Sequence, residues 1–198
     1  MYEEFFELKE RPFLTVPDPE FLYWSERHKM AFTMLRYGVM TRAPLTVVTG
    51  EIGAGKTTLL RQLMTETPDD LTVGLISNMQ TGRGELLHWV MMALDQPFDA
   101  SEPYVALFKR FQDFVVGAYA AGKRVLLIFD EAQNLDVAAL EELRMLSNIN
   151  ADKDELLQLI LVGQPQLRDL VRRPELVQFS QRISADFHLE PLGETETS

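Results

Sequence analysis

The sequence 50-GEIGAGKT-57 matches the pattern G-x-x-x-x-G-K-[ST] at every fixed position. A short run rich in β-branched residues, 45-LTVVT-49, precedes it, and 58-TLLRQLM-64 continues it with helical spacing. The three glycines of this segment lack a Cβ atom, so the backbone is able to turn its N–H groups inward. Those groups and the N-terminus of the following helix form a nest for an anion. Strand, glycine-rich turn and helix together predict a phosphate-binding loop rather than a turn without a ligand.

The polar positions of this loop have predicted roles. The Lys56 side chain should reach the β- and γ-phosphates of a nucleoside triphosphate, and the Thr57 hydroxyl should ligate Mg²⁺. We expect the loop and the first residues of the helix to bind the nucleotide together, namely Gly50, Glu51, Ile52, Gly53, Ala54, Gly55, Lys56, Thr57 and Thr58.

A second segment, 125-VLLIFDEAQNL-135, places two adjacent carboxylates after five apolar residues. Like charges at this spacing disfavour each other's ionisation, and a strand that ends in two solvated acids is the plain alternative. A phosphate-binding loop, however, needs an aspartate at the end of a second strand to hold Mg²⁺. Asp130 is predicted to supply it beside Thr57, through a water molecule, and a bound cation would offset one of the two charges. Glu131 is then predicted to polarise the attacking water, as in hydrolysing P-loop NTPases.

Strand candidates alternate with helical patterns along the chain. We expect strands at 45–50, 72–78, 124–131, 156–164 and 183–192, and helices near 26–41, 56–66, 83–95, 103–121, 137–149 and, as short pieces, 166–181. This alternation predicts an α/β P-loop fold with a five-stranded, mostly parallel sheet and helices on both faces. Residues 1–24, rich in aromatics and proline, are predicted to form an arm that packs on a core of residues 25–198.

Composition restricts the function classes. The net charge of the 198 residues is 19 − 30 = −11, which argues against broad electrostatic binding to nucleic acid or anionic membrane. The absence of cysteine excludes disulfides, thiolate nucleophiles and cysteine metal sites. Apolar runs such as 125-VLLIF-129 are far shorter than the ~20 residues of a membrane helix. The acidic N-terminus does not resemble a signal peptide, so we expect a cytoplasmic chain.

Polar residues at the ends of other strands are candidates for the same site, because ligands bind at the carboxyl ends of parallel strands. Gln164 ends the fourth strand. If that strand lies between the two strands already named, Gln164 should point at the attacking water or the γ-phosphate; the alternative is that it caps the next helix. Ser77 or Asn78, at the end of the second strand, would hold Glu131 in an idle rotamer unless they simply begin a loop.

Arg182 is the last catalytic candidate, because an arginine just before the fifth strand would reach the nucleotide of a neighbouring subunit. The alternative is a surface arginine at a helix C-terminus. For Arg168, Arg172 and Arg173, a solvated position and a contact with another subunit are equally supported. The three histidines show no metal-ligand spacing and are expected to be structural or exposed.

A series of segments spans nearly the whole chain: 1-MYEEFFELKERPF-13, 17-PDPEFLY-23, the phosphate loop, 129-FDEAQNL-135, 141-EELRMLSN-148, 161-LVGQPQLR-168 and 181-QRIS-184. This series resembles the AAA+ ATPases of the general secretion pathway protein A type, which include relatives tied to exosortase and exopolysaccharide operons. The resemblance implies an AAA+ (ASCE-type) core that uses ATP and Mg²⁺, forms a homo-oligomeric ring and helps assemble an envelope export system. It places the sensor-1 position on Gln164 and the box VII arginine on Arg182.

The resemblance also has a departure at the C-terminus. The chain stops at 191-PLGETETS-198, where the helical lid of such proteins begins, so we expect the lid and its second sensor arginine to be absent. Without a lid, nucleotide should bind more weakly, and ring assembly and turnover stay open. Adenine contacts are expected from the arm and the start of the first helix, around Tyr23 to His28.

Three functions compete at this point. The first is an ATP-hydrolysing AAA+ module that drives a secretion or envelope process. The second is an ATPase regulator of DNA transposition, which would need a basic DNA-facing surface against a net charge of −11. The third is a nucleotide-gated scaffold that does not hydrolyse ATP, against which Glu131 argues. A helicase would need two such domains, and a small-molecule kinase would lack a use for Glu131.

Overall fold

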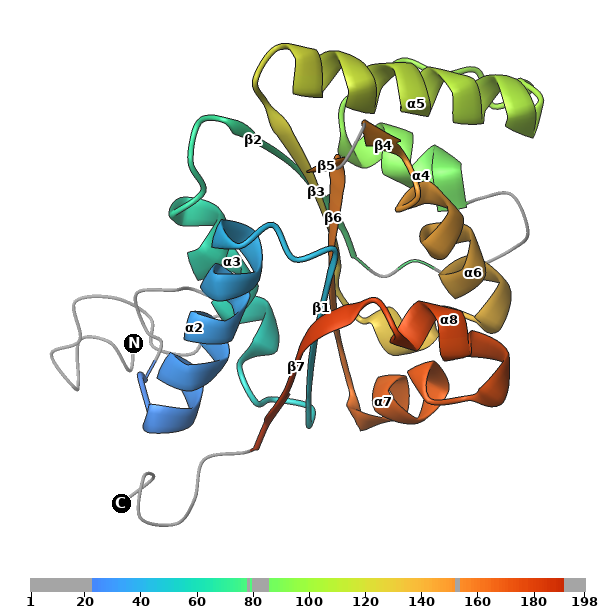
Figure 1. The fold of residues 1–198 in the computed structure, drawn as a ribbon. Coiled ribbons are helices and arrows are strands. Elements are labelled where there is room, and N and C mark those ends of the chain that lie inside the picture. The colour runs from blue at the N-terminus through green and yellow to red at the C-terminus, as the bar shows by residue number, and fades with distance from the viewer. Residues whose placement is uncertain (1–22, 78, 80–85, 152–153, 191–198) are drawn as a thin grey trace, which may run out of the picture.

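The computed structural model describes residues 23–190 except 78, 80–85 and 152–153 (Figure 1). The predicted arm therefore lies outside the described residues apart from Tyr23 and Trp24, as do Asn78 and the region in which a lid would begin. Trp24 packs edge-on against Phe32, with the ring centroids 5.2 Å apart. This contact joins the last residues of the arm to the first described helix.

Five strands form one sheet, and all of its pairs are parallel. The strands are β1 (Leu45–Gly50), β2 (Leu71–Ile76), β3 (Arg124–Phe129), β6 (Leu157–Gly163) and β7 (Ile183–Leu189). Their order across the sheet is β2-β3-β6-β1-β7. The predicted five-stranded α/β fold is confirmed, and β6 does lie between the strand of the phosphate loop and the strand that ends in the paired carboxylates.

Helices cover both faces of the sheet (Figure 1). One side carries α2 (Glu26–Met40) and α3 (Lys56–Thr65). The other side carries α4 (Leu86–Ala93), α5 (Tyr104–Ala120), α6 (Val137–Leu146), α7 (Pro165–Val171) and α8 (Val177–Ser180), together with the single-turn segments η2 (Ala132–Asn134) and η3 (Pro174–Leu176). The result is a three-layer arrangement with the sheet in the middle.

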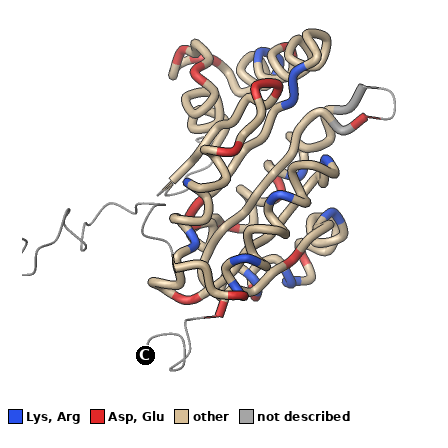
Figure 2. Tube along the Cα trace, turned by 90° about the vertical axis from the view of Figure 1, so that its left-hand side faces the viewer, with Lys and Arg blue, Asp and Glu red and all other residues tan. Residues whose placement is uncertain are grey.

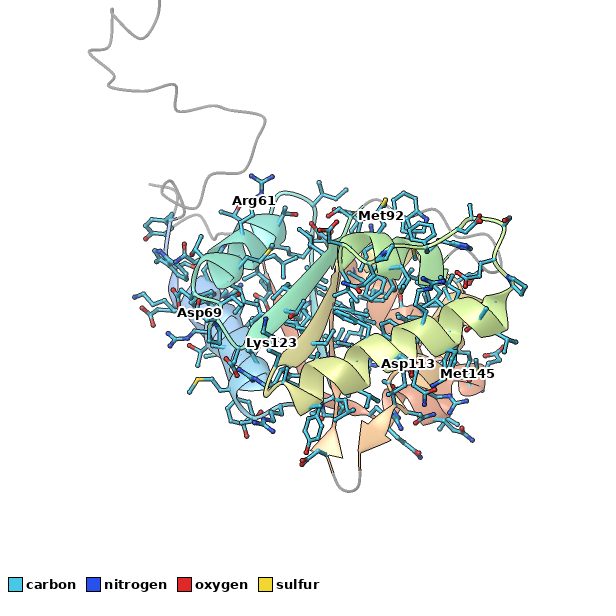
Figure 3. All side chains as sticks on the ribbon, turned by 90° about the horizontal axis from the view of Figure 1, so that it is seen from above. Arg61, Asp69, Met92, Asp113, Lys123 and Met145 are labelled. Carbon is cyan, nitrogen blue, oxygen red and sulfur yellow. The ribbon has the colours of Figure 1, made fainter. Side chains whose placement is uncertain are left out.

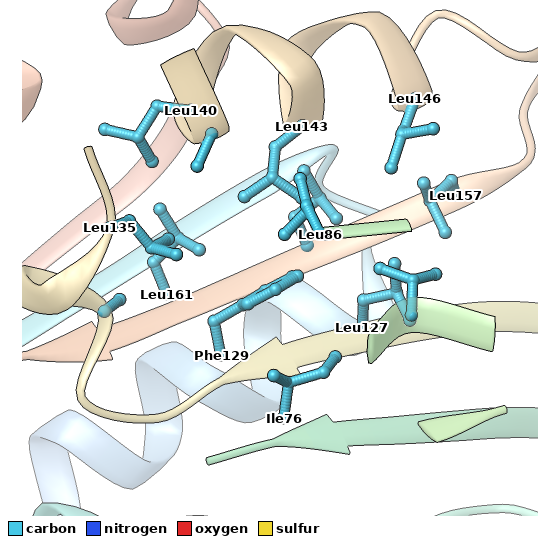
Figure 4. Packing of buried hydrophobic residues seen from close by; sticks show 14 of the residues in the cluster. Ile76, Leu86, Leu127, Phe129, Leu135, Leu140, Leu143, Leu146, Leu157 and Leu161 are labelled. Atoms are coloured by element: carbon cyan, nitrogen blue, oxygen red, sulfur yellow. The ribbon is translucent and has the colours of Figure 1, made fainter. Parts of the chain in front are cut away.

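Alternating side chains of the central strands pack into two separate hydrophobic cores, one on each face of the sheet. On β3, Leu127 and Phe129 belong to the core under α4 to α8, whereas Leu126 and Ile128 belong to the core under α2 and α3. Figure 4 shows Phe129 between the strand residues and Leu86 of α4, with the α6 leucines above them. Because both faces are covered, β1, β3 and β6 are almost entirely buried, as expected for continuous apolar runs in a parallel sheet.

Two features differ from the expected pattern. A small antiparallel pair, β4 (Asn150–Ala151) with β5 (Asp154–Glu155), precedes β6 and was not predicted. Strands of two residues carry no periodic signal, so this pair could not be predicted from the pattern of residues. The predicted helix at 137–149 ends at Leu146, where Ser147 is the C-cap.

The longest helix, α5, has one buried side and one exposed side. Leu107, Phe111 and Val115 are buried against the sheet. On the exposed side, Asp113, labelled in Figure 3, forms an ion pair of 2.5 Å with Lys109 one turn earlier. Among the described residues, no helix is both long enough and apolar enough to cross a membrane.

Candidate nucleotide site

The phosphate loop connects β1 to α3, as the motif predicts. Gly53 and Gly55 have φ angles of 78° and 82°, in the left-handed region that side chains with a Cβ atom rarely adopt. Gly55 is the N-cap of α3 and makes no side-chain cap, so the first N–H groups of the helix face the loop without a capping side chain. This geometry supplies the donors and the positive helix end that an anion requires.

Gly50 is needed for a different reason. A Cβ atom at this position would lie 2.5 Å from the backbone carbonyl oxygen of Leu189. Glycine therefore allows β7 to pair with the last residue of β1, where the phosphate loop begins. The remaining predicted nucleotide contacts differ in exposure: Glu51 and Ile52 are exposed, Ala54 is buried, and Thr57 and Thr58 are half-buried.

The Lys56 ammonium group lies inside the loop. Its Nζ donates to the carbonyl oxygens of Gly50 at 2.7 Å and Glu51 at 2.8 Å, and the residue is only 7% exposed. Burial lowers the pKa of Lys56, while the carboxylates of Glu131, Asp130 and Glu51 act in the opposite direction. The loop thus holds a buried cation close to two of the predicted catalytic and metal-binding acids.

Asp130 and Thr57 are in contact at the carboxyl edge of the sheet. The Thr57 hydroxyl donates to Oδ2 of Asp130 at 2.8 Å, although 73 residues separate them in the chain. Asp130 is 7% exposed, and burial raises the pKa of its carboxyl group, which the Thr57 hydrogen bond partly offsets. A hydroxyl and a carboxylate side by side are hard oxygen donors, the ligand type that Mg²⁺ prefers. The structure therefore brings together the two residues predicted to bind the metal.

Glu131 follows in an unusual backbone conformation. Its φ is 56°, in the left-handed region, and its N–H donates to Oδ1 of Asp130 at 2.9 Å. Such a conformation costs free energy in a non-glycine residue and is often found at functional sites. The segment η2 begins directly after it, and the two adjacent carboxylates have different partners, Thr57 for Asp130 and Gln133 for Glu131.

Gln164 points toward Glu131, not into the helix that follows. Its Nε2 lies 3.4 Å from Oε2 of Glu131, and its side chain makes no cap hydrogen bond to α7. Pro165 occupies the first position of α7, where a missing N–H group costs the helix no hydrogen bond. The contact exists because β6 lies beside β3 in the sheet.

Gln133 is a site residue that the sequence reasoning did not single out. Its Nε2 donates to Oε2 of Glu131 at 2.5 Å, and its Oε1 accepts the backbone N–H of Gln164 at 2.9 Å. The available signal was its position two residues after Glu131 in 129-FDEAQNL-135. That signal has meaning only once β6 is known to lie next to β3.

His28 is a second residue whose contact was not foreseen. The residue is buried, and its ring joins the Ser25 hydroxyl, 2.8 Å from Nδ1, to the carbonyl oxygen of Ala54, 3.1 Å from Nε2. Ser25 is the N-cap of α2. The start of α2 is thus attached to the phosphate loop, close to where adenine contacts were expected.

Arg182 is engaged within its own chain. Its guanidinium group donates to the carbonyl oxygen and the hydroxyl of Ser147 at 3.1 and 2.7 Å, and it contacts Oδ1 of Asn148. These acceptors lie at the C-terminus of α6, the kind of partner that the alternative interpretation expected. The predicted action on a neighbouring subunit remains a prediction. Arg172 and Arg173 are exposed, and Arg168 lies 3.7 Å from Asp186.

Comparison with known proteins gives a family and a relative. The family described as AAA domain matches residues 39–171. General secretion pathway protein A from Aeromonas hydrophila is 40% identical over 193 residues, which are 98% of this chain and 35% of that protein. The resemblance inferred from the sequence motifs is confirmed by these matches, and the chain spans about a third of the length of this relative.

Solved structures agree with the fold. Cdc6p from Pyrobaculum aerophilum has a TM-score of 0.65 at 18% identity, covering 85% of this chain and 46% of that one. The Aeropyrum pernix ORC2 protein, in ADPNP–ADP complexes, has a TM-score of 0.63 at 16% identity, covering 86% of this chain and 48% of that one. At these identities the likeness concerns the fold alone.

Proposed function

Because the chain belongs to the AAA domain family and is thereby a nucleotide-binding ATPase domain, we propose that it hydrolyses ATP with the help of Mg²⁺ at the loop between β1 and α3. The observation that carries this proposal is the 2.8 Å contact between the Thr57 hydroxyl and the Asp130 carboxylate. It joins the loop that binds phosphate to the strand end that carries Glu131. Thr57 and Asp130 would hold Mg²⁺ there, and the ion would offset the charge of the phosphates.

Each site residue has a separate role in the proposed hydrolysis. The N–H groups of the loop and the first turn of α3 bind the phosphates, and the Lys56 ammonium group turns from the loop carbonyls to the β- and γ-phosphate oxygens. Glu131 accepts a proton from the attacking water as general base. Gln164, whose amide lies 3.4 Å from the Glu131 carboxylate, orients that water. Asp130 cannot serve as the base, because it would be committed to the metal.

Metal removal tests this proposal. Steady-state phosphate release from ATP should depend on Mg²⁺, stop when EDTA is added and return when excess Mg²⁺ is restored, because the transferred phosphoryl group needs the cation to offset its charge. Asp130→Ala should lose turnover at all Mg²⁺ concentrations. Hydrolysis that persists in EDTA would contradict the role given to Thr57 and Asp130.

We further propose that this module works at an envelope export system. The similarity to general secretion pathway protein A supports this pathway. In this proposal the module lies in the cytoplasm and forms a homo-oligomeric ring when its lid is present, so that Arg182 of one subunit faces the nucleotide of the next. A strain that carries Glu131→Gln in the full-length protein should then fail to assemble the export machinery, while a strain with normal assembly would speak against the pathway.

The two other functions are less well supported. The net charge is −11, and in the view of Figure 2 basic and acidic residues are interspersed over the described part of the trace, which does not favour a DNA-facing surface. ATP-dependent binding to duplex DNA at physiological salt would favour a regulator of transposition instead. A scaffold that binds but does not hydrolyse ATP would leave Glu131 and its two amide partners without a use.

A further inference from the structure

The Gln133 side chain bridges two strand ends of the site. From η2, which follows β3, its Nε2 donates to Oε2 of Glu131 at 2.5 Å. Its Oε1 accepts the N–H of Gln164, the residue that follows β6, at 2.9 Å. Both polar atoms of one half-buried amide are therefore used, one on the carboxylate and one on the backbone of the neighbouring strand end.

The surroundings are shaped to admit this bridge. A Cβ atom on Gly163, the last residue of β6, would lie 2.7 Å from Oε1 of Gln133 and 3.1 Å from its backbone nitrogen. The position thus leaves room for η2 to approach the end of β6 closely. The bridge joins the end of the buried strand β6 to the one-turn helix η2. Both elements are more rigid than a surface loop.

Glu131 is held at several points. Its backbone N–H donates to Asp130, its φ of 56° sets the direction in which its side chain leaves the chain, and its Oε2 receives the amides of Gln133 and Gln164. Both amides act on the same carboxylate oxygen. In the proposed hydrolysis, the second oxygen, Oε1, would then accept the proton from water.

We propose that Gln133 is a positioning residue, which fixes the carboxylate of Glu131 in register with the end of β6 so that one oxygen faces the attacking water. This inference rests on the proposed ATP hydrolysis. A general base misplaced by about 1 Å loses up to about a hundredfold in rate, because the reacting atoms are no longer aligned. Nucleotide binding depends on the loop after β1 and not on this bridge, so the effect belongs in kcat.

A matched pair of variants separates this role from a general effect of losing a glutamine. Gln133 and Gln166 both line an open groove of about 470 Å³ beside α7. Gln133→Met keeps the length of the side chain and removes both hydrogen bonds, whereas Gln166→Met changes an exposed residue of the same groove. We expect Gln133→Met to lower kcat about ten- to a hundredfold with KM and the Kd for ATP within about twofold of wild type. Gln166→Met should match wild type.

A double variant tests whether Gln133 acts through Glu131. Single-turnover rates should show that Gln133→Met costs little further activity in a Glu131→Gln background, because the carboxylate that it positions is gone. Rates are compared per folded molecule, counted by ATP binding, so that a loss of folded protein does not count as a loss of kcat.

The outcomes separate the two proposals. If wild type hydrolyses ATP and Gln133→Met keeps its kcat, or changes KM alone, the positioning role is overturned while the proposed function stands. Full additivity of the two substitutions would also overturn it. If wild type shows no hydrolysis, the proposed function fails, and the role of Gln133 fails with it.

Discussion

Lys56 and Asp130 are two charged side chains that the protein buries almost completely, each only 7% exposed. Burial moves the pKa of each toward its neutral form, down for Lys56 and up for Asp130. Burying charge is unfavourable unless it is paired and hydrogen-bonded. Both residues have such partners, in the loop carbonyls and in Thr57. These partners are neutral groups, and in the proposed function phosphate and Mg²⁺ would supply the opposite charges.

Glu142 on α6 offers a pH test at the scale of one residue. Burial raises its pKa, which a hydrogen bond from Tyr104 partly offsets, and its Oε1 is buried with no partner. A raised pKa means that the folded state binds the proton more tightly than the unfolded state. The contribution of Glu142 to the free energy of unfolding therefore falls as the pH rises from 4.5, the ordinary pKa, through the raised value. Burial also raises the pKa of Tyr104 to about 12, so the phenol stays neutral in that window.

Glu142→Gln should therefore stabilise the protein at pH 7. The expected gain in Tm is about 2–4 °C, which corresponds to about 1 kcal/mol in a domain of this size. The gain should shrink as the pH falls through the raised pKa toward 4.5 and vanish below it, where Glu142 is protonated in both states. Thermal unfolding of both proteins between pH 4 and 8 measures it. A difference in Tm that does not change with pH would contradict the assignment of a buried carboxylate.

At the scale of elements, the order of the strands determines which residues meet. Thr57 follows β1 and Asp130 follows β3, and the two are brought to one sheet edge with β6 between them. Gln164 reaches Glu131 for the same reason. The motif and the alternation of strands and helices predict this much, because parallel strands place their carboxyl ends together.

Other contacts could not be predicted from the sequence. Gln133 is one letter among several polar residues after β3, and its role depends on hydrogen-bond geometry that periodicity does not carry. Arg182 binds residues 34 and 35 positions away, at the end of another helix. The β4–β5 pair is too short to leave a pattern. The contacts of single polar side chains outside the motifs, and short irregular elements, are thus what the sequence did not predict.

Arg182 yields a prediction about the junction of α6 and β7. Arg182→Ala should lower the free energy of unfolding by about 1–3 kcal/mol, because it removes hydrogen bonds from a charged donor to Ser147 and Asn148. Urea denaturation at a protein concentration low enough to keep the chain monomeric measures this. An arginine that serves only a neighbouring subunit would leave the stability of the monomer unchanged, and that result would contradict the contact with α6.

At the scale of the whole molecule, a three-layer AAA domain places its phosphate loop, the proposed metal ligands and Glu131 at the carboxyl edge of a single sheet. The chain spans about a third of the length of general secretion pathway protein A from Aeromonas hydrophila, so a role in envelope export is a proposal. The domain itself is a nucleotide-binding ATPase domain, and we propose that it hydrolyses ATP through Glu131.

The most direct test is steady-state ATP hydrolysis by wild type and Glu131→Gln over the same series of protein concentrations, with the Kd for ATP measured for both. We predict turnover by wild type and a loss of at least about a hundredfold in the variant, because a general base contributes about 10²–10⁴ in rate. The Kd should stay within about twofold, since the phosphates are bound by the loop. Equal turnover in the two proteins, or ATP binding by wild type without hydrolysis at any concentration, would contradict the account.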